Sequence, residues 1–153
     1  TITAANASSI SDGASALVLA DSDTVADAGW KPAARILAVN SFARAPGEFT
    51  IAPIGAVQGL LEKMNWTVAD VDLFEINEAF AMVTMLAIQE LNLDASKVNV
   101  YGGACAQGHP IGSTGSRIIL TLITALKNKD LKRGIASLCI GGGEATAIAV
   151  ELV

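Results

Sequence analysis

Segments typical of strands and of helices alternate along most of this chain, and that alternation restricts the fold more than any other feature. From residue 33 the order predicts βαβαβαββ, which is typical of an α/β protein whose mostly parallel sheet is covered by helices. The two final strands are so closely joined that we expect them to pair antiparallel, giving a mixed, mostly parallel five-stranded sheet. The predicted strands are 33–43, 71–76, 97–102, 133–143 and 145–153, and the predicted helices are 53–64, 78–91 and 114–128.

A domain boundary is predicted near residue 30, where Pro32 interrupts the pattern. Before it, residues 14–20 are typical of a strand and residues 21–29 of a short helix that ends at Gly29. The chain has 153 residues, enough for one domain with a substantial core and too few for two full domains. Its first residue is threonine rather than methionine, and we take this as an indication of a processed chain or a fragment.

The surface of this chain carries few charges. Charged residues make up 16% of the sequence, whereas a typical soluble domain has about 25%. Apolar residues reach 52%, with a mean hydropathy of +0.49. We therefore expect part of the surface to be buried against another domain or subunit, the alternative being a compact monomer rich in alanine and glycine.

Charge and cysteine content exclude several classes of protein. A net charge of −5, with no run of basic residues, argues against nucleic-acid binding, and no apolar stretch approaches the ~18 residues of a membrane helix. Cys105 and Cys139 lie far apart and form neither a disulfide framework nor a metal-binding pattern. A reducing compartment is therefore expected, and the cytoplasm is the default location.

Three loops follow the carboxyl ends of predicted strands, where α/β proteins form their active sites. They are "NEAF" at 77–80, "GGACAQGHPIG" at 102–112 and "CIGGG" at 139–143. Since the ends of parallel strands meet at one edge of a sheet, we expect Asn77, His109 and Cys139 to converge.

His109 is the only histidine, and it stands between Gly108 and Pro110. A rigid, glycine-rich loop is a suitable mount for a general base or a hydrogen-bond donor. The alternative is a histidine that is merely hydrogen-bonded within a turn. A phosphate-binding loop is excluded, because no lysine follows the glycines and the G-x-G-x-x-G spacing is missing.

The other candidates each have a functional and a structural interpretation. Cys139 is either a buried thiol or a reactive thiol at a strand end, with glycine N–H groups nearby to hold an oxyanion. Asn77 either caps the following helix or orients a water. Ser8 lies in a polar, turn-rich segment and contacts either a ligand or solvent, and Phe80 belongs to the core, with one edge available to a pocket.

Four segments, taken in order, resemble the thiolases, the coenzyme A-dependent acyltransferases. They are "NASSISDGAS" at 6–15, "LFEINEAFA" at 73–81, "GGACAQGHPIGSTGSR" at 102–117 and "LCIGGG" at 138–143. The resemblance covers essentially the whole chain and is to the C-terminal half of an enzyme of the acetyl-CoA acetyltransferase type. The condensing enzymes of fatty-acid synthesis share the fold but would not be expected to carry "NEAF" with "CIGGG". Thiolase-like lipid carriers typically depart from "NEAF".

The resemblance implies a role for each of these positions. His109 matches the histidine that activates the nucleophilic cysteine and, with a water positioned by Asn77, holds the thioester oxygen. Cys139 matches the acid/base cysteine, and the Gly141 N–H matches part of a second oxyanion hole. The positions expected to line the tunnel for the pantetheine arm of coenzyme A are Ser8, Ala79 and Phe80.

The implied reaction is Claisen condensation of acyl-CoA thioesters or thiolytic cleavage of 3-ketoacyl-CoA. The family resemblance implies coenzyme A and acyl-CoA as substrates, with no tightly bound cofactor and no metal. It implies neither a nucleic-acid nor a membrane partner. A homo-oligomer, dimeric or tetrameric, is expected for the complete protein.

The same resemblance places the nucleophilic cysteine in the N-terminal half of a thiolase, and Cys105, in the histidine loop, does not match it. Residues 1–30 would be the terminal strand and helix of the N-terminal thiolase domain, and residues 31–153 the C-terminal thiolase domain. We therefore expect this chain to be inactive alone and to work with the N-terminal half. The alternative is a non-catalytic thiolase-like subunit with an assembly or binding role.

Overall fold

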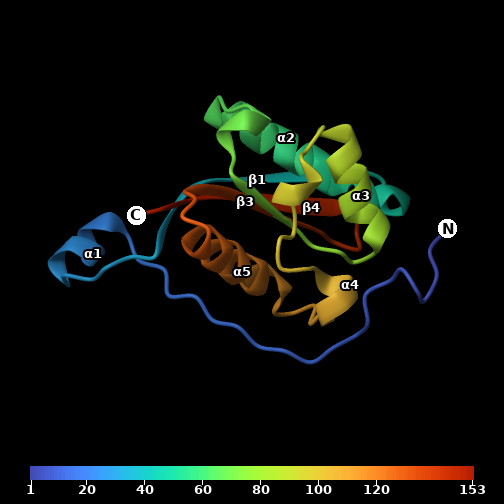
Figure 1. Ribbon diagram of the computed structural model, residues 1–153, viewed down its shortest axis with the longest axis horizontal. Helices are drawn as coiled ribbons and strands as arrows, with labels where there is room; N and C mark the ends of the chain where they lie inside the picture. The colour runs from blue at the N-terminus through green and yellow to red at the C-terminus, as the bar shows by residue number, and fades with distance from the viewer.

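The computed structural model describes residues 1–153 and contains one four-stranded sheet with helices on both faces (Figure 1). Helices α2 and α3 cover one face and α5 covers the other. Strands are β1 (Ala34–Ala43), β2 (Leu73–Ile76), β3 (Arg133–Cys139) and β4 (Glu144–Leu152). Helices are α1 (Ser22–Asp27), α2 (Ala52–Met64), α3 (Ala81–Glu90), α4 (Ala104–Gln107) and α5 (Thr114–Asn128), with 3₁₀ turns η1 (Pro46–Ile51), η2 (Val68–Asp70) and η3 (Ala95–Lys97).

The strand order in the sheet is β1-β4-β3-β2. β2 pairs parallel with β3, whereas β4 runs antiparallel to both β3 and β1, so the mixed sheet and the antiparallel final pair are confirmed. The prediction that the sheet is mostly parallel is wrong, since only the β2–β3 pair is parallel: the glycine turn at 141–143 folds β4 back between β3 and β1.

The prediction of a fifth strand at 97–102 is wrong. This segment makes a single parallel bridge, Val98 to Phe74, and then leaves the sheet at Asn99, whose φ is +47°. The Asn99 side chain takes the place of a strand backbone, since its Oδ1 accepts from Ile76 N at 2.8 Å and its Nδ2 donates to Ile76 O at 2.8 Å. The free edge of β2 is thus satisfied by a side chain rather than by another strand.

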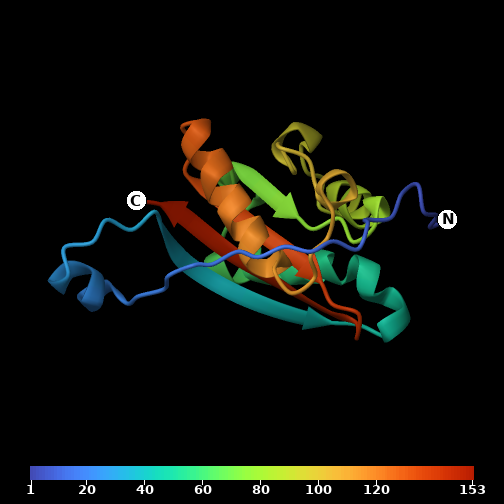
Figure 2. The ribbon, with the colours of Figure 1, turned by 90° about the horizontal axis from the view of Figure 1, so that it is seen from below.

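The segment before β1 lies outside the two-sided core. Residues 14–20, predicted as a strand, are extended without a strand partner and run across α5 (Figure 2). Val18 and Leu19 in this segment are 88% and 72% exposed. The predicted helix is confirmed as α1, which Asp21 caps by accepting from Thr24 N at 2.8 Å, but α1 buries none of its residues.

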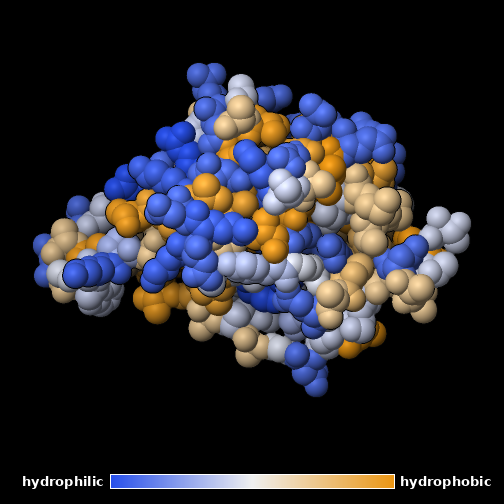
Figure 3. Space-filling view, in the orientation of Figure 1, coloured by the Kyte–Doolittle hydropathy of each residue, from blue (hydrophilic) through white to orange (hydrophobic).

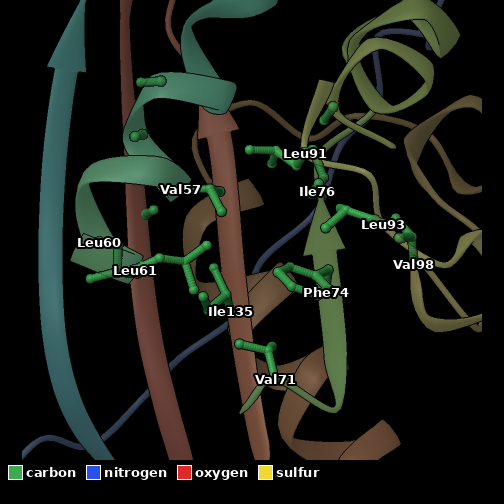
Figure 4. Packing of buried hydrophobic residues seen from close by; sticks show 14 of the residues in the cluster. Val57, Leu60, Leu61, Val71, Phe74, Ile76, Leu91, Leu93, Val98 and Ile135 are labelled. Atoms are coloured by element: carbon green, nitrogen blue, oxygen red, sulfur yellow. The ribbon is translucent and has the colours of Figure 1, made fainter. Parts of the chain in front are cut away.

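Two apolar clusters lie on opposite faces of the sheet. In the larger, Val57 and Leu60 of α2 pack against Phe74, Ile76 and Ile135 of the strands (Figure 4). The smaller lies between the sheet and α5. Strand β2 is buried at all its positions, which explains why its residues are apolar except for Glu75. The smaller cluster comprises Leu73, Ile118, Leu122, Ala125, Leu126, Ala136 and Val150.

Apolar side chains also remain on the surface, as orange patches among the charged residues in Figure 3. They include Val39, at 55% exposure, and its β1 neighbours Ile36 and Phe42. A hollow of about 260 Å³ lies beside them, between α5 and the strands β1, β4 and β3. No helix combines the length and apolar composition needed to cross a bilayer.

Candidate active site

The ends of β2 and β3 place Asn77 and Cys139 at the same edge of the sheet. These parallel strands are in register at Ile76 and Ser137, and Asn77 N donates to Ser137 O at 2.9 Å. The loop 102–112 follows η3 and a turn rather than a strand, but it reaches the same edge. The Asn99 side chain fixes the start of that loop against β2.

His109 is held through both ring nitrogens. Its Nε2 lies 3.3 Å from the amide nitrogen of Asn77, which is buried, and its Nδ1 lies 2.7 Å from Thr114 Oγ1. The Thr114 hydroxyl donates to Pro110 O at 3.1 Å. The expectation that Asn77 and His109 come together therefore matches the geometry. Asn77 does not cap the next helix, since α3 begins at Ala81 after the N-cap residue Phe80.

The hydrogen-bond partners define which nitrogen of His109 carries the proton. Arg117 Nη2 lies 3.0 Å from Asn77 Oδ1 and can only donate, so the amide oxygen faces Arg117 and the amide nitrogen faces the imidazole. Nε2 must then accept. Since the Thr114 hydrogen is used on Pro110 O, Nδ1–H donates to Thr114 Oγ1. The contacts at Nε2 and at Nδ1 therefore both indicate the neutral tautomer that is protonated at Nδ1.

Electrostatics also favours a neutral imidazole. Burial holds the pKa of His109 below its ordinary value, and the positive charge of Arg117 lowers it further. At neutral pH His109 therefore presents a lone pair on Nε2 rather than an acidic proton, as a general base requires.

Cys139 and His109 line one open cavity of about 390 Å³. The same cavity is lined by Gly141 and by the three positions expected to contact the substrate arm, Ser8, Ala79 and Phe80. Asn77 lies behind His109 and is not part of the lining. The structure thus brings together every candidate site residue from the sequence.

The Cys139 thiol is half-buried at the end of β3, and burial raises its pKa. It therefore keeps its proton at neutral pH. The Gly141 N–H, two residues on, takes part in no hydrogen bond within the chain and lies at the cavity wall. A protonated thiol beside a free amide donor can give a proton to a carbanion and stabilise an oxyanion.

The N-terminal segment joins the loops of the site. Ser8 N and Ser8 Oγ both lie close to Ala79 O, at 3.1 and 2.9 Å, while His109 N donates to Ser9 O at 3.0 Å. The Ser8 hydroxyl therefore already donates to the protein's own backbone. Its expected contact with a ligand stays a prediction.

The Glu78 side chain holds the loop that carries His109. Its carboxylate accepts from Cys105 N at 3.1 Å and from Asn99 Nδ2 at 3.3 Å. A side chain at Gly103 would collide with this carboxylate, which explains the glycine. Cys105 packs with its Sγ 3.8 Å from the carbonyl oxygens of Asn6 and Glu78, away from the cavity.

Sequence reasoning missed three residues that shape the site. Phe49 of η1 packs edge-on against Phe80, with ring centroids 6.1 Å apart. Thr114 and Arg117 hold His109 and Asn77, as described above. Arg117 carried a signal, because a cation in the first turns of a helix opposes the helix dipole and needs another reason to be there. No three His, Cys, Asp or Glu side chains are placed to hold a metal ion.

Comparison with known families gives a match over most of the chain. A family model described as "Thiolase, C-terminal domain" matches residues 30–152. The acetyl-CoA acetyltransferase of Allochromatium vinosum is 47% identical over 98% of this chain, and that of Schizosaccharomyces pombe is 46% identical over 100%. The chain spans only 38% and 39% of the length of these two relatives.

Solved structures agree with the sequence relatives. The acetyl-CoA acetyltransferase of Bacillus anthracis has a TM-score of 0.96 at 44% identity, covering 99% of this chain and 39% of that one. Acat5 thiolase from Ascaris suum, solved in complex with coenzyme A, has a TM-score of 0.95 at 46% identity, covering 100% and 40%. The human mitochondrial 3-ketoacyl-CoA thiolase has a TM-score of 0.90 at 35% identity, covering 99% and 38%.

Proposed function

Because the chain belongs to the thiolase family as its C-terminal domain, we propose that it supplies the acid–base half of a thiolase active site. The reaction is Claisen condensation of acyl-CoA thioesters, or its reverse, thiolytic cleavage of 3-ketoacyl-CoA. The observation that carries this proposal is the shared cavity, in which His109, Cys139 and Gly141 face the same space.

His109 acts on the nucleophile. Its Nε2 lone pair exchanges the Asn77 amide hydrogen bond for the proton of a cysteine thiol, and the resulting thiolate attacks the carbonyl carbon of the substrate. The same nitrogen, then protonated, donates a hydrogen bond to the thioester oxygen, assisted by a water that Asn77 positions. Removing one donor from an oxyanion hole typically costs about 10²–10³ in kcat.

Cys139 acts on the α-carbon. In thiolysis its thiol gives a proton to the carbanion that leaves when the carbon–carbon bond breaks, and the Cys139 thiolate remains. In condensation the Cys139 thiol first gives its proton to the coenzyme A thiolate that leaves as the acyl-enzyme forms. The resulting Cys139 thiolate removes a proton from the α-carbon of the second acyl-CoA, and the carbanion attacks the acyl group on the nucleophilic cysteine. The Gly141 N–H stabilises the oxygen of the tetrahedral intermediate.

The nucleophilic cysteine comes from the N-terminal half of a thiolase. Cys105 does not line the cavity, and the relatives extend well beyond the portion that this chain matches. The exposed apolar residues of β1 and the neighbouring hollow of about 260 Å³ supply a surface for that half.

Residues 1–30 form the terminal strand and helix of the N-terminal domain in this proposal, and residues 31–153 form the C-terminal domain. The exposed, unpartnered segment 14–20 supports this assignment, as does α1, which buries nothing against the sheet. A strand that finds no partner within this chain is available to a sheet of the other half.

The substrates are coenzyme A thioesters, with no tightly bound cofactor. Ser8, Ala79 and Phe80 line the approach for the pantetheine arm. The complete protein is a homo-oligomer, dimeric or tetrameric. Its two free cysteines fit the reducing cytoplasm as its location.

The test is complementation. The chain is mixed or co-expressed with the N-terminal half of an acetyl-CoA acetyltransferase, and thiolysis of acetoacetyl-CoA is followed by loss of its absorbance. We expect no turnover from the chain alone and turnover from the pair. Cys139→Ser should abolish it, whereas Cys105→Ser, the matched control, should not. If the two halves form a complete complex that shows no thiolysis, the result would support a non-catalytic subunit instead.

A further inference from the structure

We propose that Arg117 is a positioning residue that orients the Asn77 amide and thereby selects the tautomer of His109. Arg117 lies near the start of α5, behind the cavity, and does not line it. Its contact with the site is the donation from Nη2 to Asn77 Oδ1 at 3.0 Å. It therefore acts through Asn77 rather than on the substrate.

Without Arg117 the hydrogen-bond network around His109 has two self-consistent arrangements. In the observed one, Asn77 Nδ2 donates to Nε2 and Nδ1–H donates to Thr114. If the Asn77 amide turned over, its oxygen would face Nε2 and favour a proton there. The Thr114 hydroxyl would then rotate away from Pro110 O and donate to Nδ1 instead.

A guanidinium removes this ambiguity because it has donors and no acceptor. Turning the amide would place its NH₂ group against the Arg117 donors, which is repulsive and leaves donors unpaired. Asn77 is buried, so no solvent can satisfy the alternative arrangement. One half-buried arginine thus fixes the orientation of an amide and, through it, the lone pair of the imidazole.

The cost of burying Arg117 argues that its place is functional. Its Nε and Nη1 are buried without any hydrogen-bond partner, and no carboxylate lies within salt-bridge distance. Its position in the first turns of α5 is also unfavourable to the helix dipole. An apolar side chain could fill the same space without burying the unpaired Nε and Nη1 donors, so packing alone does not account for an arginine here.

The charged and titratable groups around His109 come from several elements. Arg117 on α5 is the positive one and acts on the imidazole, whereas the carboxylates of Glu75 on β2 and Glu78 after it act on Arg117 and raise its pKa against the larger lowering by burial. The thiols of Cys139 and Cys105 complete the set, and burial raises the pKa of both. Arg117 is the charge that acts directly on the imidazole, lowering its pKa.

The catalytic consequence rests on the proposed function, in which Nε2 takes the thiol proton. The structural part of the inference does not, because it concerns the imidazole alone. His109 is the only histidine, so the imidazole signals in a long-range ¹H–¹⁵N NMR spectrum of the ¹⁵N-labelled chain belong to it without assignment. The two nitrogens have distinct shifts in each tautomer, so the spectrum reports the tautomer directly.

We expect a single Nδ1–H tautomer in the unaltered chain. Arg117→Met should convert it to a mixture of tautomers and raise the His109 pKa, because both the donor and the charge are lost. Arg117→Lys retains a charged donor and should restore the native pattern. Arg35→Met, which removes an exposed charge on β1, is the matched control and should change neither quantity.

Two results would overturn the proposal. One is an Nε2–H tautomer in the unaltered chain, a measurement that does not require any variant to fold. The other is a folded Arg117→Met chain, judged by its amide spectrum, whose tautomer and His109 pKa equal those of the unaltered chain. Failure of the complementation assay would leave both measurements valid, so the two proposals fail separately.

Discussion

The amide nitrogen of Asn77 lies 3.3 Å from Nε2 of His109, although the two residues belong to loops that reach the sheet edge by different routes. Asn77 is fixed by the end of β2, whereas His109 is fixed by the N-terminal segment, Thr114 and Pro110. The contact joins a buried amide to the one imidazole of the chain. It sets which atom of His109 can accept a proton.

Replacing Asn77 should therefore damage catalysis more than folding. In the complemented enzyme we expect Asn77→Ala to lower kcat by about 10²–10³, because the water that it positions and the orientation of His109 are both lost. Steady-state thiolysis measures this. The control is Asn128→Ala, at the C-terminal end of α5 and away from the site. This variant loses only an exposed hydrogen bond to the Tyr101 hydroxyl and should keep nearly full activity. A kcat within twofold of the unaltered enzyme for Asn77→Ala would contradict the assignment.

The alkylation of Cys139 should depend steeply on pH. Burial raises the pKa of its thiol, so the reactive thiolate is scarce at neutral pH and increases as the pH rises. In a Cys105→Ser background, iodoacetamide labelling followed by intact mass should be slow at pH 7 and accelerate through pH 9 and above. Rapid, pH-independent labelling near pH 7 would show a thiolate already present and exclude the protonated thiol proposed here.

Glu75 should make the chain less stable as the pH rises. Burial raises its pKa to about 7, from an ordinary value of 4.5, with the charge of Arg117 opposing the shift. Between these pH values the folded state holds a proton that the unfolded state has lost, so the free energy of unfolding falls as pH rises from 4.5 to 7 and is level above. The amplitude is on the order of 3 kcal/mol.

Glu75→Gln removes this titration and should flatten the profile, so that the variant exceeds the unaltered chain in stability at pH 8 and the difference shrinks towards pH 5. Urea unfolding at several pH values measures it. Asp72→Asn is an unsuitable control, because its carboxylate accepts from two backbone N–H groups. Glu90→Gln, on an exposed position of α3, is the better one. Parallel profiles for Glu75→Gln and the unaltered chain would contradict the assignment.

Gly103→Ala should destabilise the histidine loop. The new methyl group would collide with the Glu78 carboxylate and displace it from Cys105 N. We expect a loss of about 1–3 kcal/mol in the free energy of unfolding. Gly47→Ala meets open space and is the matched control. Equal stability of the two variants would show that the Glu78 contact does not constrain the loop.

The sequence predicts those elements whose pattern reflects burial. The mainly apolar sequence of β2 and the periodicity of α2 and α5 come directly from the two apolar clusters. Residues 97–102 are also predicted as a strand but form none, because Asn99 at positive φ replaces the backbone pairing with its side chain. Residues 14–20 have a strand pattern but pair with no strand of this sheet.

The site residues likewise fall into those that the sequence pattern predicts and those that it does not. Asn77, His109 and Cys139 are predictable because strand ends and glycine loops place them at one edge. Thr114 and Arg117 are not, because their roles depend on which side-chain atoms meet, and helical periodicity carries no information on that. Arg117 has only the indirect signal of a cation where the helix dipole disfavours one.

The central claim is that Cys139 transfers the proton at the α-carbon, whereas a cysteine of the N-terminal half carries the acyl group. Transient kinetics of the complemented enzyme tests this claim most directly. Radiolabelled acetyl-CoA is mixed with enzyme carrying Cys139→Ser, and both acetylation of the protein and formation of acetoacetyl-CoA are followed. The account predicts acyl-enzyme formation that is partly retained and carbon–carbon bond formation that is abolished. Normal turnover by Cys139→Ser would contradict it.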